Sequence, residues 1–188
     1  KLVEEVKRLI EESARKNEEL IKEVEKEIRR SRKRDKELIE EIERLIREVK
    51  KRLEELLTEK KDDDRVREVV RRLEERLKRL LEEVEEVARR NNEILERLLK
   101  EVEDVVRTNR ERMKELLEEV KTKKDREEAE ELVRRVKEEI KRSTTESEKL
   151  VKEVKDRARK SHEDSERLAR EVLKEIRRLL EEVEKDVR

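Results

Sequence analysis

Hydrophobic residues recur along the chain with the spacing of an α-helix that buries one face. Between Leu2 and Leu57, Leu, Val and Ile follow one another at intervals of mostly three and four residues. At about 100° per residue these positions form one stripe about 120° wide, which is typical of a helix packed in a core. An isolated charged helix would need no such stripe, so the pattern predicts helices packed together.

The stripe changes phase twice, and each change predicts a turn. It reappears at Val66 rotated by about 130°, and at Ala129 it is rotated again by about 200°. Because one continuous helix keeps its phase, we expect turns near residues 58–64 and 121–125. Helix N-cap residues occur in both places: three aspartates at 62–64, and Asp125 with an acidic residue three positions later. Neither turn contains the Gly that commonly follows a helix C-terminus.

Two turns give three helices of nearly equal length. They are expected at about residues 1–57, 64–121 and 125–188, each roughly 85–95 Å long at about 1.5 Å per residue. Short connections make neighbouring helices antiparallel. The sequence therefore predicts the all-α class and an up-down-up three-helix bundle, with residues 1–188 forming one elongated domain.

Core positions repeat every 18 residues, in both the apolar and the polar set. Eighteen residues in five turns is the period of a straight helix, whereas a seven-residue repeat imposes supercoiling. We therefore expect a straight, nearly untwisted bundle. One apolar series is Leu2, Leu20, Leu38 and Leu56.

Antiparallel alignment of the helices gathers polar residues at two heights, 18 residues apart. In this alignment, opposed residue numbers add to about 121 in the first pair of helices and about 246 in the second. Buried polar groups cost free energy unless they are partnered, so we predict two buried hydrogen-bond networks that specify helix register and orientation. Level 1 contains Ser13, Asn17, Asn109, Ser143 and Ser147, with Thr108 and Thr144 at its margin; level 2 contains Ser31, Asp35, Asn91, Ser161 and Ser165, with Asn92 and His162 at its margin.

Level 2 also contains the residue types of a catalytic triad. Ser161, His162 and Asp35 match a nucleophile, a base and an orienting carboxylate. Adjacent helical residues point about 100° apart, however, and mid-helix N–H groups are already bonded and cannot form an oxyanion hole. We therefore expect no enzyme activity and no catalytic residue. With a single His and no Cys, we also expect no metal site and no cofactor.

Two features of the polar levels leave alternatives open. His162 either shares a polar network with Asp35 or lies at the edge of the stripe in solvent. Residues 142–148 and 161–164 resemble helix N-caps, but the apolar phase continues across both segments, which favours an uninterrupted helix.

Composition excludes several functional classes. The 188 residues include 57 Lys and Arg and 57 Asp and Glu, 61% charged in all, with no Gly, Pro, Cys, Trp, Tyr or Phe. Leu, Val and Ile number 52, enough to argue against disorder. The basic run at residues 29–34 suggests nucleic acid, but it is expected to face glutamates at 82–86, and zero net charge without aromatic residues predicts no nucleic-acid binding. No apolar run is long enough for a membrane span, and no signal peptide is expected.

The idealised 18-residue repeat, equal charge, aliphatic core and repeated polar modules together resemble a de novo designed helical bundle with buried hydrogen-bond networks. The resemblance implies a structural scaffold without natural substrate, required partner or natural location, found in the soluble cytoplasm of an expression host. The stripe width is sufficient to close one three-helix core, which favours a monomer. The alternative is an oligomeric building block that associates with itself or with another chain.

Overall fold

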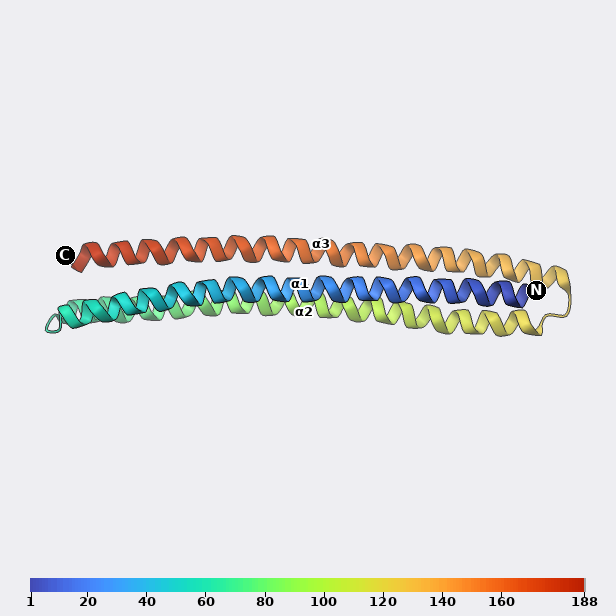
Figure 1. The fold of residues 1–188 in the computed structure, drawn as a ribbon, viewed down its shortest axis with the longest axis horizontal. Helices are drawn as coiled ribbons and strands as arrows, with labels where there is room; N and C mark the ends of the chain where they lie inside the picture. Colours follow the sequence, from blue (N-terminus) through green and yellow to red (C-terminus); the bar gives the residue numbers. More distant parts are fainter. Residues whose placement is uncertain (188) are drawn as a thin grey trace. The chain divides into compact units, whose positions relative to one another are not determined.

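The computed structural model describes residues 1–187, which form three α-helices joined by two short turns (Figure 1). The helices are α1 (Leu2–Glu59), α2 (Asp64–Thr122) and α3 (Arg126–Val187). The predicted class, the three helices and both turn positions are confirmed. The predicted third helix extended to residue 188, and Arg188 lies outside the described residues. Helix α3 runs without interruption through residues 142–148 and 161–164, as the apolar phase predicted.

Each turn is closed by an aspartate that caps the following helix. The Asp63 carboxylate accepts a hydrogen bond from the backbone N–H of Arg65 at 3.0 Å, and the Asp125 carboxylate accepts one from Glu127 at 3.2 Å. An N-cap oxygen satisfies an N–H that has no partner inside the helix. Throughout the described chain no residue has a positive φ, so neither turn needs the conformational freedom of Gly.

Packing divides the chain into two compact units, each containing one segment of every helix. Unit 1 consists of Lys1–Arg29 and Ile94–Ala158, and unit 2 consists of Arg30–Glu93 and the part of α3 from Arg159 onward. Level 1 lies wholly in unit 1 and level 2 wholly in unit 2. The single domain expected from the sequence stays a prediction.

Unit 1 contains two aliphatic clusters, and in both of them α1, α2 and α3 pack together. Cluster A consists of Val24, Ile28, Leu95, Val102, Val106, Val151, Val154 and Ala158. Cluster B consists of Val6, Met113, Leu116, Val120, Leu132, Val133 and Val136.

Unit 2 contains one larger aliphatic cluster, which also takes residues from all three helices. Representative members are Ile42 and Leu53 from α1, Leu77 from α2, and Val172 and Ile176 from α3. Each of these side chains is at most 2% exposed, so burial of aliphatic surface is the main stabilising term of the unit.

Polar contacts between helices define the antiparallel register inside each unit. Arg76 pairs with Glu175 in unit 2, and Arg112 pairs with Glu139 in unit 1; both pairs of residue numbers add to 251. The antiparallel arrangement predicted from the sequence placed residues of α2 and α3 opposite each other where their numbers add to about 246. Side chains tilt toward the N-terminus of their own helix, so in an antiparallel pair the tips that meet belong to residues with a higher sum.

Candidate functional site

The polar residues predicted for the two levels are mostly buried. Asn109, Asn91 and His162 are half-buried, and of the marginal members Thr144 and Asn92 are half-buried while Thr108 is exposed. Eight side chains are 0–7% exposed: Ser13, Asn17, Ser143 and Ser147 in unit 1, and Ser31, Asp35, Ser161 and Ser165 in unit 2.

Both levels are built in the same way. Helices α1 and α3 each contribute two polar residues four positions apart, which places the two side chains on one helix face. Helix α2 contributes one asparagine, Asn109 in level 1 and Asn91 in level 2. The two levels differ chemically at Asp35, which occupies the position of Asn17 in the repeat.

Level 1 lies between the two aliphatic clusters of unit 1 and is poorly satisfied by direct contacts. Four of its buried atoms have no hydrogen-bond partner in the described part of the chain: Asn17 Oδ1, Asn109 Nδ2, Ser143 Oγ and Ser147 Oγ. A buried polar group without a partner costs about 1–3 kcal/mol. The hydrogen-bond network expected at this height therefore stays a prediction.

Level 2 has direct hydrogen bonds between α2 and α3. The Asn91 side-chain amide donates to Ser165 Oγ at 3.2 Å and to the backbone carbonyl of Ser161 at 3.4 Å. Because one amide reaches both a side chain and the backbone of α3, these contacts hold the two helices at one relative height in unit 2.

The Asp35 carboxyl is the buried ionisable group of level 2. Burial is the largest influence and raises its pKa from 3.8, while the charge of His162 and a hydrogen bond with Ser165 act in the opposite direction. Asp35 Oδ1 is buried without a hydrogen-bond partner. The arrangement disfavours the charged form of Asp35, because the surrounding helices replace only part of its hydration.

His162 lies close enough to act electrostatically on Asp35, but the carboxylate within ion-pair distance of its imidazole belongs to another residue. Its Nε2 lies 3.7 Å from Glu166 Oε2, one turn along α3, and its Nδ1 is buried without a partner. Glu166 also binds Arg170 at 2.6 Å. Glu166 was not predicted as a member of level 2, although its spacing of four residues from His162 places the two side chains on one helix face.

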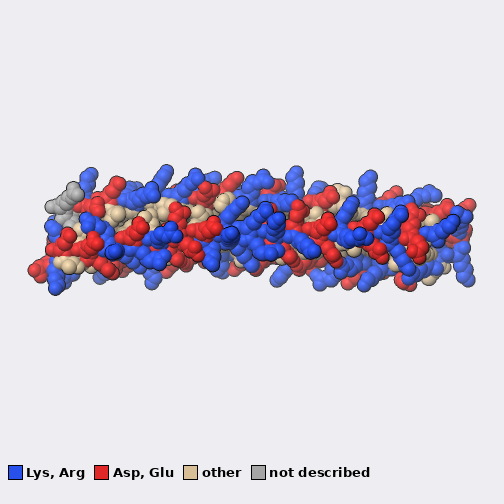
Figure 2. Space-filling model, in the orientation of Figure 1, with Lys and Arg blue, Asp and Glu red and all other residues tan. Residues whose placement is uncertain are grey.

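Ion pairs on the surface recur with the same spacing between α1 and α3. Lys137 pairs with Glu5 at 2.9 Å and Lys155 pairs with Glu23 at 3.0 Å, each across 132 positions. The Lys137 hydrogen bond and charge lower the pKa of the Glu5 carboxyl. Figure 2 shows Lys and Arg interleaved with Asp and Glu over the visible face.

The basic run at residues 29–34 contacts α2 through Arg32, whose Nε donates to Asn92 Oδ1 at 2.6 Å. Glu86, one of the glutamates expected to face the run, pairs with Arg89 and Arg90 of its own helix at 2.6 and 3.2 Å. Charge pairing therefore operates within α2 as well as between helices. Pairing of the run with the glutamates at 82–86 stays a prediction.

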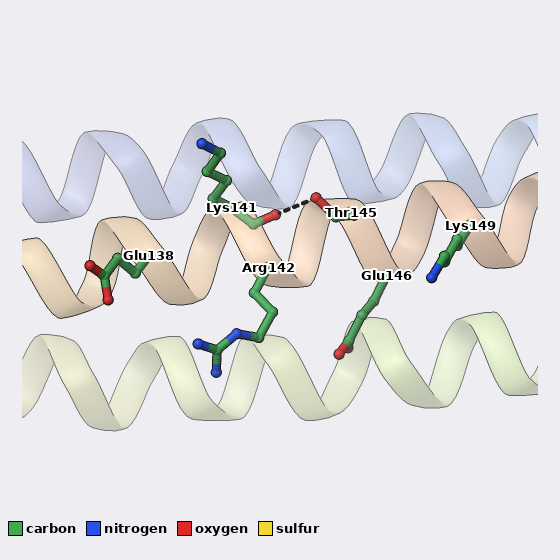
Figure 3. Close-up of a pocket in the computed structure, with 6 residues that line it drawn as sticks. All are labelled: Glu138, Lys141, Arg142, Thr145, Glu146 and Lys149. Atoms are coloured by element: carbon green, nitrogen blue, oxygen red, sulfur yellow. Dashed lines mark hydrogen bonds between the residues drawn. The ribbon is translucent and has the colours of Figure 1, made fainter.

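A surface groove on α3 is not a comparable site. It has a volume of about 390 Å³ and is lined by exposed side chains that include Lys141, Thr145 and Glu146 (Figure 3). The Thr145 hydroxyl donates to the Lys141 backbone carbonyl at 2.9 Å. Apart from Thr145, its lining consists of long charged side chains of α3, and all of them are exposed, so the groove lacks the buried polar group that orients a ligand.

Among residues 1–187, no group of three or more His, Cys, Asp or Glu side chains could hold a metal ion. None of the helices described has a stretch long and apolar enough to cross a membrane. Comparisons of the chain with protein-family models, curated proteins and solved structures give no match.

Proposed function

We propose that this chain is a de novo designed structural scaffold, in which modular polar levels specify how three helices align. The observation that carries the proposal is the recurrence of one arrangement in both units: paired polar residues on α1 and α3 facing an asparagine of α2. Idealised helices whose local and tertiary features all agree are what design rules prescribe, and repetition of one module at a fixed interval fits that origin.

The levels act by making misalignment unfavourable. In an aliphatic core a displaced helix still buries Leu and Val, but a displaced Asn91 would lose both Ser165 and the Ser161 carbonyl. The turns of four and three residues already limit sliding inside one chain. The polar levels therefore matter most against chains that exchange helices and associate in a wrong alignment.

A monomeric scaffold is further supported by the surface. None of the large hydrophobic residues in the described chain is exposed, so no apolar face is available for a second copy. The building block that binds a partner is the weaker candidate, because it would need such an apolar face. We also propose that the chain has no catalytic activity.

The test removes level 1 and measures alignment. Its five members become aliphatic in the variant Ser13→Ala, Asn17→Leu, Asn109→Leu, Ser143→Ala and Ser147→Ala. Because the chain has no Cys, alignment can be read with Glu5→Cys/Lys137→Cys and a short bis-maleimide reagent. A second pair, Glu23→Cys/Lys137→Cys, reports misalignment, because residue 23 lies 18 residues, or about 27 Å, along α1 from residue 5.

In the protein with level 1 intact, we expect the cysteines at positions 5 and 137 to cross-link within one chain, and those at positions 23 and 137 not to cross-link. The aliphatic variant should unfold at a higher urea concentration but form both cross-links, including products between chains. Thr108→Ala/Thr145→Ala, at two exposed positions, is the matched control. A variant that keeps a single intramolecular cross-link and one monomeric mass would contradict the proposal.

A further inference from the structure

Level 1 contains a small cavity that is lined by two of its residues with unsatisfied atoms, Asn17 and Asn109. The cavity measures about 20 Å³ and its lining includes Asn17, Asn109, Val106 and Met113. Val106 belongs to cluster A and Met113 to cluster B, so the cavity lies between the two aliphatic clusters of unit 1. Asn17 is only 5% exposed.

The two orphaned atoms on the cavity wall are an acceptor and a donor. Asn17 Oδ1 can accept a hydrogen bond and Asn109 Nδ2 can donate one, and neither has a protein partner. A water molecule needs about 10–15 Å³ of accessible space and at least two polar neighbours. The volume and the chemistry both match a single water.

We propose that level 1 binds one water molecule, which donates to Asn17 Oδ1 and accepts from Asn109 Nδ2. Rotation of either amide by 180° would leave the site suitable, because water can donate twice and accept twice. A water bridge is nearly as favourable in enthalpy as a direct hydrogen bond, so it would satisfy two of the four unpartnered buried atoms of level 1. The inference does not depend on the proposed function, since the water would bind whether or not level 1 specifies alignment.

Unit 2 provides an internal comparison. The cavity beside level 2 measures about 10 Å³, at the lower limit for water, and its lining includes Asp35 and Ser165 but not Asn91. Asn91, the counterpart of Asn109, already donates to Ser165 and to the Ser161 carbonyl. The amide that faces the cavity in unit 1 therefore has protein partners in unit 2, so we expect the bridging water in unit 1 alone.

The test combines a high-resolution crystal structure of the chain with oxygen-17 magnetic relaxation dispersion, which counts long-lived bound waters in solution. We expect a water within hydrogen-bonding distance of both amides. The number of long-lived waters given by the dispersion amplitude should decrease by one in Asn17→Leu/Asn109→Leu. It should stay unchanged in Asn92→Leu, since Asn92 is a half-buried asparagine outside the cavity.

A crystal structure in which the two amides bond each other directly, or in which the cavity holds no water, would overturn the proposal. Equal dispersion in the parent chain and in the folded double variant would also overturn it. If the double variant does not fold, the crystal structure of the parent chain decides the question alone.

Discussion

Asp35 shows how one side chain changes the physics of a repeated site. It occupies the position of Asn17, and both residues are at least nine-tenths buried. The carboxyl of Asp35 can carry a charge, which burial penalises, whereas the amide of Asn17 cannot. Level 2 is therefore sensitive to pH in a way that level 1 is not.

Asp35→Asn should stabilise the protein at neutral pH by on the order of 1 kcal/mol, because it removes a charge that burial disfavours. The folded-state pKa of Asp35 is raised above 3.8, so the folded chain retains a proton that the unfolded chain has lost. The stability associated with this proton is complete below about pH 3.9 and is lost as pH rises through the folded pKa.

The free energy of unfolding of Asp35→Asn should therefore exceed that of the parent chain by an amount that increases from about pH 4 toward neutral pH and then becomes constant. Urea unfolding at several pH values measures this difference. Asp156→Asn, at an exposed position of α3, is the matched control and should show no such trend. An advantage that is equal at all pH values would show that the Asp35 charge does not affect folding.

His162→Thr should raise the pKa of Asp35 further, because the charge of His162 lowers it in the parent chain. The substitution copies the residue that level 1 has at this position, Thr144. The carboxyl ¹³C shift of Asp35, followed through an acid titration by NMR, reports the change. An identical Asp35 titration in the two proteins would mean that the residues are not coupled.

At the scale of the helix, each element is defined by an amphipathic stripe and by the residue that starts it. The Asp125 carboxylate accepts from the Glu127 N–H, and its backbone carbonyl accepts from the Ala129 N–H at 3.0 Å. Asp125 thus satisfies two N–H groups of the first turn of α3. Asp63 does the same for α2, where it accepts from the N–H groups of Arg65 and Arg67.

Asp125→Ala should destabilise the protein by about 1 kcal/mol, since it leaves an N–H of the first turn without its partner. Amide hydrogen exchange at residues 127–130 should accelerate roughly in proportion to the loss of local stability. Asp125→Asn keeps an equivalent cap and should behave like the parent chain. Equal exchange in Asp125→Ala would indicate that the turn is held by other contacts.

Helix bounds were predictable to within about two residues, because a change of stripe phase and a capping aspartate report the same position. Continuity through residues 142–148 was predictable for the same reason, since the local cap-like residues never interrupt the stripe. Helix alignment was predicted only approximately. The lean of side chains toward each N-terminus shifts the contacts by several residues, as the Arg76–Glu175 pair shows.

At the scale of the whole molecule, the chain carries 57 positive and 57 negative residues, and none of the large hydrophobic residues in its described part is exposed. Light scattering coupled to size exclusion should give a mass near 23.2 kDa, independent of concentration. The expectation follows because association needs apolar area that this surface does not provide. A mass that is a multiple of this value would favour the oligomeric building block.

The amino-acid sequence by itself determined the helices, their ends, the buried face of each and the two heights at which polar residues gather. These follow from periodicity and capping, which depend on neighbours in the chain. Only the tertiary structure decided which polar atoms meet. Asn91 reaches α3 whereas Asn109 faces a cavity, and Asp35 senses His162 while His162 pairs with Glu166. Whether two polar atoms meet depends on differences of about one ångström in the positions of the helices. Those positions are set by the packing of side chains from all three helices, not by local sequence.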